Sequence, residues 1–531
     1  MIIYIGGDGW NTTFGATPSR IFSTPAMIDN SASYRVFKIG ELTRLIAGQL
    51  IPDSQESAVN LACTCRHLKE PALSVLWETQ DSLHTLLETL PREFWDWYDD
   101  GSVVCDLNLP LEELSAQRSG LFQFKVKGDP SPEAWSKVHR YASWMRQTDV
   151  DGWTIPEEET FRKLCLNSPP GGWFPALQGL YWCITRSNLP YFDLFLSPNM
   201  KRISITISWG DSRVPKTFLP VIASTISALP APILQLLFVH IDRRGISPAY
   251  LKDSLSSVVS RFGPSFMQFS SPAPLSDAAM NHLIHLPRLH TWHTEHPPPD
   301  YPGSSLPLVF PPLREFTLGE GAAPGWLSLF KRLGDCVSST QDSTPLSRVR
   351  ESLESLNVGD FPNPIIDVSF TSIIRAFRNL LRLNVMVNCS DGQCVFGLNN
   401  DNVTELAVAL PRLDSLLLGY PCGENTCATT VACLLPISVH CPGLRSLGIH
   451  FNTTNLIDDL KSISEDPRFQ ELRSLGKCTL SCLGVYDTPL TIDESDFETV
   501  ACGTTVIFPN LERCNGWEEV NWELAEVQGL V

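Results

Sequence analysis

The clearest hydrophobic pattern of the chain lies between Phe37 and Thr79, where apolar residues recur every three or four positions in three successive stretches. That spacing places them on one face of a helix, so we predict three short amphipathic helices. We expect Asp53 to cap the second helix and Pro71 to lie in the first turn of the third. The apolar positions are Ile39, Leu42, Leu45, Ile46, Leu50, Ala58, Leu61, Ala62, Cys65, Leu73, Leu76 and Trp77.

The helical unit, which we expect over residues 34–80, buries too small a fraction of its surface to be stable alone. Its remaining apolar face is therefore expected to belong to a partner.

Three motifs stand in this region in a fixed order: IGEL at 39–42, LACTCRHL at 61–68 and PALSVLW at 71–77. Together they resemble the F-box, a three-helix motif that docks on the Skp-type adaptor of a cullin–RING ubiquitin ligase. F-boxes usually open with Leu-Pro, where this chain has Ile39 and Gly40. The resemblance implies adaptor contacts from among Ile39, Leu42, Leu45, Ile46, Leu61, Leu68, Pro71, Leu73, Leu76 and Trp77, some of which must instead pack the helices together.

Residues 81–170 are expected to form a helical bridge. Leucines at 83, 86, 87 and 90 predict a short helix that Pro91 ends, and Ser131-Pro132-Glu133 has the composition of a helix start. Between them lies the aromatic run Trp95, Trp97 and Tyr98. We expect these aromatic side chains to pack the F-box-like unit against the rest of the chain, although a binding surface is the alternative.

From about Phe174 onward a short phrase recurs: apolar or Cys, often Pro, any residue, Leu, two residues, apolar, one residue, apolar. Copies include FPALQGLYW at 174, FPPLREFTL at 310, LPRLDSLLL at 410 and FQELRSLG at 469, with a weak copy, PSFMQFS, at 264. The central position, such as Leu177, Met267 or Leu472, returns about every 30 residues, a period typical of solenoids. Helical patterns separate the copies, and the whole resembles a degenerate leucine-rich-repeat array.

The resemblance implies an α/β solenoid, or horseshoe, of about twelve units over residues 171–531, with strands on one wall and helices on the other. Alternation within each strand predicts which side chains point inward. We expect the inward residues of one strand to be Leu313, Phe316 and Leu318, and the exposed wall positions to include Arg314, Glu315, Thr317, Asp414, Ser415, Leu417, Arg445, Ser446 and Gly448.

The composition indicates a folded protein, and the net charge argues against some classes of partner. The 531 residues are 43% hydrophobic and 18% charged, and the net charge of −18 disfavours nucleic acid or an anionic membrane as the main partner. No apolar run approaches the ~20 residues of a membrane span. Residues 1–33 have no secretory pattern and are expected to be a disordered leader, so the 16 cysteines are expected to be reduced in a cytoplasmic or nuclear protein.

Two clusters could bind metal. Five of the 11 histidines lie between His282 and His296, but their spacing matches no closed zinc site, and a solvated edge is the preferred interpretation. The cysteines lack a Cys-x-x-Cys pair and are interpreted as buried thiols; they are Cys422, Cys427, Cys433, Cys441, Cys478 and Cys482. We therefore predict no metal and no cofactor.

No phosphate-binding, nucleophile-elbow, metalloprotease or dinucleotide motif is present in the sequence. The resemblances together predict a non-catalytic substrate-recognition subunit of a Skp–cullin–F-box ubiquitin ligase that binds an unidentified target protein. One alternative is a repeat scaffold whose F-box-like segment no longer binds an adaptor. The other is an enzyme in an unfamiliar fold.

Overall fold

The computed structural model places most of the chain between residues 39 and 515. It describes residues 39–51, 55–99, 122–150, 158–185, 188–207, 218–229, 234–241, 248–295, 311–319, 349, 351–362, 371, 374–388, 397–419, 427–474, 479–484, 500–501, 504, 507–508, 510–511 and 513–515. The expected leader over 1–33 and the expected cap Asp53 lie outside these residues.

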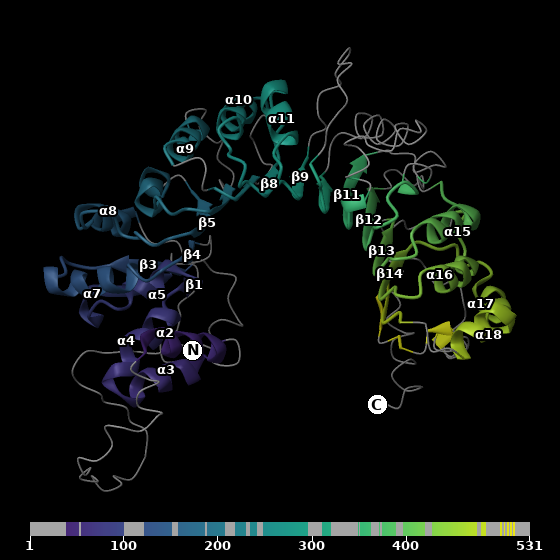
Figure 1. The fold of residues 1–531 in the computed structure, drawn as a ribbon, viewed down its shortest axis with the longest axis horizontal. Helices are drawn as coiled ribbons and strands as arrows, with labels where there is room; N and C mark the ends of the chain where they lie inside the picture. Colours follow the sequence, from purple (N-terminus) through teal and green to yellow (C-terminus); the bar gives the residue numbers. More distant parts are fainter. Residues whose placement is uncertain are drawn as a thin grey trace, which may run out of the picture. The chain divides into compact units, whose positions relative to one another are not determined.

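The chain divides into two compact units, one ending at Ile246 and one beginning at Ser247. Each unit combines helices with parallel strands that pair in chain order (Figure 1). This confirms the predicted α/β class, and the arrangement is compatible with an α/β solenoid. Among the described residues, no helix has the length and apolar character needed to cross a membrane.

The first unit begins with three helices and continues into strands and further helices. Its elements are α2 (Gly40–Leu50), α3 (Gln55–Thr64), α4 (Arg66–Leu76), β1 (Thr79–Gln80), α5 (Leu83–Leu87), η1 (Arg92–Phe94), β2 (Trp95–Asp99), β3 (Phe122–Val126), α7 (Pro132–Ala142), β4 (Gln147–Val150), α8 (Glu158–Leu166), β5 (Gly179–Ile184), η2 (Leu189–Phe195), β6 (Arg202–Ile207), α9 (Phe218–Ser227) and β7 (Leu236–Ile241).

Helix α4 differs from its prediction because it begins five residues before Pro71, at Arg66. Pro71 therefore lies inside the helix and not in its first turn. The helix continues past it because its apolar face is buried, and burial outweighs the one backbone donor that proline removes. Leu68, Ala72 and Leu73 are each at most 3% exposed.

The segment 81–170 contains strands as well as the expected helices. Strands β2 and β3 form an antiparallel pair in which Trp95 lies opposite Val126 and Trp97 opposite Phe124. The aromatic run thus alternates as a strand does, and the buried Trp95 and Phe124 rings stack at 5.8 Å between centroids. The structure replaces the purely helical bridge with a mixed one because this period-two pattern forms a small sheet.

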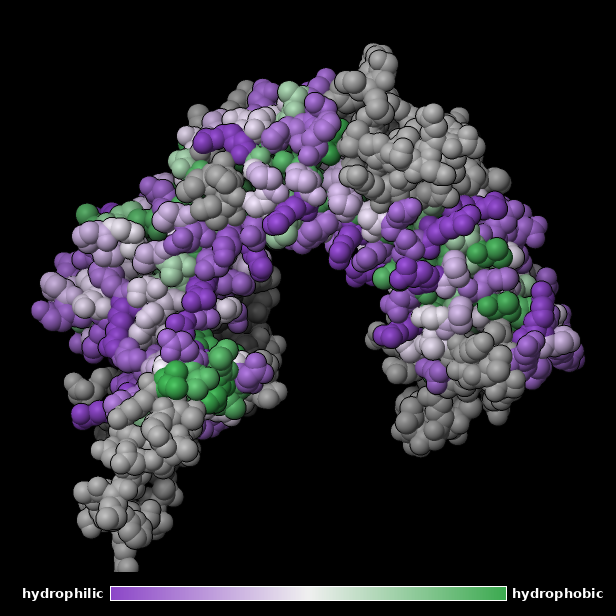
Figure 2. Space-filling model, in the orientation of Figure 1, coloured by the Kyte–Doolittle hydropathy of each residue, from purple (hydrophilic) through white to green (hydrophobic). Residues whose placement is uncertain are grey.

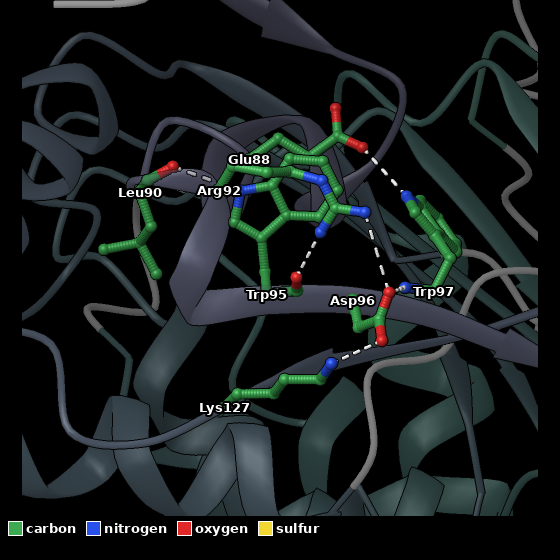
Figure 3. A network of polar contacts seen from close by, with 7 residues as sticks. All are labelled: Glu88, Leu90, Arg92, Trp95, Asp96, Trp97 and Lys127. Carbon is green, nitrogen blue, oxygen red and sulfur yellow. Dashed lines mark hydrogen bonds and ion pairs between the residues drawn. The ribbon is translucent and has the colours of Figure 1, made fainter.

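Polar contacts hold this antiparallel pair to the preceding helix (Figure 3). The Trp97 Nε1–H donates to Glu88 Oε1 at 3.0 Å, and the Trp95 Nε1–H donates to the Leu90 carbonyl at 3.1 Å. Burial raises the pKa of Glu88, while the Trp97 hydrogen bond opposes that rise. The indole contacts therefore fix both tryptophans on α5 and its following turn.

The carboxylate of Asp96, in strand β2, lies close to two cationic side chains. Lys127 Nζ donates to Asp96 Oδ2, and Arg92 lies 3.6 Å from Asp96 Oδ1, as Figure 3 shows. The Lys127 hydrogen bond lowers the pKa of Asp96, which keeps that side chain ionised. The Asp96 contacts thus join the two strands near the end where Trp95 pairs with Val126.

Parallel pairing in the first unit starts before the expected boundary at residue 171. Strand β1 pairs with β4 (Thr79 with Gln147), and β4 pairs with β5 (Gln147 with Gly179). Strands β5, β6 and β7 continue the order with Leu180 opposite Ile203 and Ile203 opposite Leu237. The helical unit is therefore followed directly by the first parallel strand.

The second unit repeats the helix and strand alternation. Its elements are α10 (Pro248–Val259), β8 (Gln268–Ser271), α11 (Asp277–Ile284), β9 (Thr291–Thr294), β10 (Glu315–Leu318), β11 (Ser355–Pro362), β12 (Arg382–Asn388), α15 (Asn400–Ala409), β13 (Ser415–Leu418), η3 (Val431–Cys433), α16 (Leu434–His440), β14 (Ser446–Ile449), α17 (Leu456–Glu465), α18 (Pro467–Ser474), β15 (Cys482–Gly484) and β16 (Arg513–Asn515).

The strands of the second unit bury one side and leave the other side open. Helices α15 and α16 lie on one side of strands β12 to β14 in Figure 1. In β10 the side chains of Phe316 and Leu318 are at most 3% exposed, and Leu313 is 1% exposed, as predicted. Glu315 and Thr317 are half-buried on the other side, which we call the open face.

In two copies of the recurring phrase, the central residue is not the buried strand residue that we predicted. Leu472 lies in helix α18, and the strand of that repeat is β15, in which Leu483 is buried. Leu480, two residues before β15, is buried as well. In the weak copy the buried residue is Phe266, with Met267 half-buried. Both errors arise because a Leu-x-x-Leu spacing also fits a helix, and one-residue offsets change which side a strand residue faces.

Candidate functional site

Helix α2 exposes large aliphatic side chains to solvent. Ile39 is 47% exposed, Leu45 65% and Ile46 37%, and these are three of the six large apolar side chains that are exposed among the described residues. Figure 2 shows a hydrophobic patch over the part of the first unit where Figure 1 draws α2. We call Ile39, Leu45 and Ile46 the α2 face.

The opposite side of α2 carries small residues that approach α4. Thr43 and Ala47 are fully buried. A Cβ atom added at Gly40 would lie 3.9 Å from Pro71 Cγ, and one added at Gly48 would lie 3.9 Å from Val75 Cγ1. Helix α2 therefore packs on α4 through its small residues, and this packing turns the large apolar residues outward.

The remaining predicted contact residues divide by burial. Leu68, Leu73 and Trp77 are 2%, 3% and 8% exposed, so in this chain they form the core of the helical unit. The other predicted contact residues are half-buried; they are Leu42, Leu61, Pro71 and Leu76.

The helical unit is attached to the first parallel strands by a shared carboxylate. Glu78 Oε1 accepts a hydrogen bond from Arg44 of α2 at 2.5 Å and lies 3.6 Å from Arg146, which precedes β4. The Trp77 ring stacks on Tyr141 of α7 at 4.7 Å between centroids. A further ion pair joins Glu70 of α4 to Arg140 of α7. Together, these contacts fix the position of α2 and α4 on the sheet.

The wall positions of the second unit that were predicted to be exposed are mostly half-buried. Arg314 and Arg445 are exposed, and Asp414, Ser415, Leu417 and Ser446 are half-buried. Arg445 Nε lies 3.3 Å from Asp414 Oδ1. Gly448, which was also predicted to be exposed, is buried.

The histidines do not form a metal site within the described residues. No group of three or more His, Cys, Asp or Glu residues could hold a metal ion in that part of the chain. His282 Nε2 forms a hydrogen bond with the Phe262 carbonyl at 3.0 Å. His290 Nδ1 forms one with Thr291 Oγ1 at 3.1 Å. Burial lowers the pKa of His290, which keeps that imidazole neutral near neutral pH. His296 lies outside the described residues.

Three described cysteines of the second unit are buried, as predicted, but Cys482 is half-buried, contrary to the prediction. Cys427, Cys433 and Cys441 are at most 2% exposed. Burial raises the pKa of Cys433 and raises that of Cys441 to about 12. Thiols held protonated in this way are poor nucleophiles and poor metal ligands. Cys422 and Cys478 lie outside the described residues.

Sequence reasoning missed the residues that fix the helical unit. Glu78, Arg44 and Arg146 are far apart in sequence, so no local pattern joins them.

Comparison with protein-family models gives no match, and no curated protein matches the sequence. The function is therefore argued from the chain itself.

Proposed function

We propose that this chain is the substrate-recognition subunit of an SCF-type (cullin–RING) ubiquitin ligase. The α2–α4 unit docks on a Skp-type adaptor, and the array of parallel strands binds a target protein. The chain supplies no catalytic group, and ubiquitin transfer belongs to partner subunits in the cytoplasm or nucleus.

The observation that carries this proposal is the exposed α2 face. Soluble proteins rarely leave adjacent large aliphatic side chains in water unless they bind something. An 11-residue helix with Leu45 65% exposed and Ile46 37% exposed presents the kind of apolar stripe that enters a groove of a partner protein. Because the same residues resemble an F-box, we propose a Skp-type adaptor as this partner.

The attachment of the helical unit supports the second half of the proposal. A substrate receptor acts by raising the effective concentration of target lysines near the ubiquitin thioester. That effect requires the docking helices to keep a stable position on the strands that come after them. Within the first unit, Glu78 and the stacked rings of Trp77 and Tyr141 provide such an attachment.

Binding to a purified Skp-type adaptor tests the proposal. We expect the full chain to bind, and the double variant Leu45→Asp with Ile46→Asp to bind at least about tenfold more weakly, a loss of about 1.4 kcal/mol. Matched controls are Val221→Asp in α9 and Val408→Asp in α15, which are exposed to a similar extent at 47% and 55%. No binding by the wild-type chain, or equal binding by all variants, would contradict the proposal.

A non-catalytic repeat scaffold is the second candidate. Gly40, where an F-box usually has proline, favours it, because the α2–α4 unit would then only cap the first strands. In that case the wild-type chain fails to bind the adaptor, and Gly40→Pro does not restore binding.

A further inference from the structure

Strands β5, β6 and β7 of the first unit carry aromatic side chains on the side opposite their buried core. The core residues Leu180, Ile203 and Leu237 are fully buried. On the other side, Tyr181 of β5 and Phe238 of β7 are only half-buried. Neither ring contacts another aromatic ring in the described part of the chain, so both present free ring surface.

Ser204 of β6 separates the two aromatic residues. In the parallel register it lies directly opposite Tyr181 on one side and Phe238 on the other. Neighbouring strands are about 4.8 Å apart, so the two aromatic residues leave the sheet about 9.6 Å apart. A side chain in contact with both rings needs about 7–8 Å, because carbon atoms meet at about 3.5–4.0 Å on each side. The small serine therefore leaves room for one apolar side chain between the rings, and we call these three residues the aromatic slot.

The open face of the second unit has a different composition. Its middle row, from β8 to β14, carries no Phe, Tyr or Trp; the residues are Ser270, His293, Thr317, Asn357, Asn384, Leu417 and Gly448. Tyrosine and phenylalanine are enriched in the buried centres of protein interfaces. The aromatic slot is therefore the part of the described strand surface that most resembles such a centre.

A positive charge lies beside the slot. Arg202, on β6, is exposed, and no carboxylate pairs with it among the described residues. Its register neighbours Gly179 and Leu236 are uncharged. The carboxylate in these strand rows is that of Asp149 on β4, one strand beyond Tyr181. The Arg202 guanidinium is thus available to an acidic group from outside the chain.

We propose that the aromatic slot and Arg202 bind an extended segment of the target protein that carries an acidic residue close to an apolar one. The apolar side chain enters between the two rings, above Ser204, and the carboxylate pairs with Arg202. Same-side residues of an extended strand are about 6.7 Å apart, which is also the spacing of Arg202 and Ser204 along β6. The acidic and apolar residues are therefore expected two positions apart. This inference rests on target binding by the array, but it does not depend on adaptor docking by α2.

Selection from a library of random dodecapeptides displayed on phage, with the full chain as bait, tests this site. We expect the recovered peptides to be enriched in an aromatic or large aliphatic residue two positions from an aspartate or glutamate. Absence of this enrichment would overturn the proposal.

Two variants test whether the recovered peptides use the slot. Tyr181→Ala with Phe238→Ala is expected to bind them at least about tenfold more weakly. Ser204→Phe fills the slot, keeps both rings and is expected to weaken binding to the same extent. The control, Met386→Ala with Leu417→Ala, removes half-buried apolar side chains from the open face of the second unit and is expected to keep the affinity. Thermal unfolding checks that each variant is folded. Unchanged binding by folded slot variants, or an equal loss in the control, would overturn the proposal.

Ionic strength tests the part assigned to Arg202. Arg202→Met is expected to bind an acidic recovered peptide about threefold more weakly. Binding by this variant is also expected to lose most of the salt dependence seen with wild type, because the ion pair is absent. A salt dependence equal to that of wild type would show that the carboxylate pairs elsewhere, and would overturn the role of Arg202.

Single-stranded nucleic acid is another class of ligand that stacks on aromatic rings beside cations. Fluorescent oligothymidylate is the probe, and no binding is expected because the net charge of the chain is −18. Oligothymidylate binding that is lost in the slot variants would overturn the assignment to a protein segment. All these probes act on the purified full chain, so a failure of adaptor binding leaves the results unchanged, and their failure leaves adaptor docking standing.

Discussion

Helices α2 and α4 are the same length, and both carry apolar residues at helical spacing, yet they bury opposite kinds of side chain. Helix α4 buries Leu68 and Leu73, at 2% and 3% exposed. Helix α2 buries Thr43 and Ala47 and leaves Leu45 65% exposed. The large residues of α4 therefore build the core of the helical unit, whereas the small residues of α2 let that helix approach closely and turn its large residues outward.

The difference shows that an apolar stripe predicts which side of a helix is hydrophobic. It does not predict whether that side packs within the chain or on another protein. The apolar side of α4 is buried within the helical unit, since α4 packs on both α2 and α3. For the α2 face, we propose that the cover is another protein. Four changes test this division, and they are given from the largest expected effect on stability to the smallest.

Leu73→Ala is expected to destabilise the helical unit by about 2–5 kcal/mol, because it removes buried methyl groups and leaves a cavity. Amide hydrogen exchange of α4, measured by mass spectrometry, reports this locally. Protection equal to wild type would show that α4 is not the core of the unit.

Gly40→Pro is expected to stabilise α2 by about 0.4–1 kcal/mol by restricting the unfolded chain. Gly40 is the first residue of the helix, Ile39 before it is extended, and an added Cβ meets nothing nearer than 3.9 Å. Hydrogen exchange of α2 measures the change. Gly48→Pro is the control, since proline inside the helix is expected to cost about 3 kcal/mol. A loss of protection with Gly40→Pro would contradict the prediction.

A double-mutant cycle on Arg44→Ala and Glu78→Gln is expected to give a coupling of about 0.2–1 kcal/mol, read from chemical denaturation. The value is small because both side chains reach solvent and Glu78 keeps Arg146 nearby, at 3.6 Å, when Arg44 is removed. The exposed pair Arg375 and Glu405 serves as control and is expected to couple less strongly. Equal coupling in the two cycles would indicate that the Glu78 pair does not fix α2.

Leu45→Ala is expected to change the free energy of unfolding by no more than about 0.5 kcal/mol, because the side chain already lies in water. Chemical denaturation measures this, and adaptor binding is expected to weaken in the same variant. A destabilisation as large as that of Leu73→Ala would mean that the α2 face packs within the chain.

Much of the fold could be predicted from local patterns. Apolar spacing predicted the three helices between residues 39 and 76, although α4 begins earlier than expected and Cys65 is exposed between two of them. Strand alternation predicted the burial of Phe316 and Leu318 opposite Glu315 and Thr317. The antiparallel pair β2–β3 was missed because its aromatic run was interpreted only as packing the F-box-like unit against the rest of the chain, within a helical bridge. Leu472 was misplaced because its spacing fits a helix equally well.

The candidate site was predicted only as a set of residues. The predicted set of contact residues included Ile39, Leu45 and Ile46 as well as Leu68 and Leu73. The sequence could not show which of them are exposed and which are buried. The separation depends on Thr43 and Ala47, whose small side chains set how α2 meets α4.

The sequence by itself determined the period of the elements and, in strands such as β10, the side that turns inward, because backbone geometry fixes both within a few residues. Only the tertiary structure decided which apolar stripe is covered, which distant charges meet at Glu78, and that Tyr181 and Phe238 lie on either side of Ser204. Those relations depend on contacts between residues far apart in the chain, and no local periodicity records them.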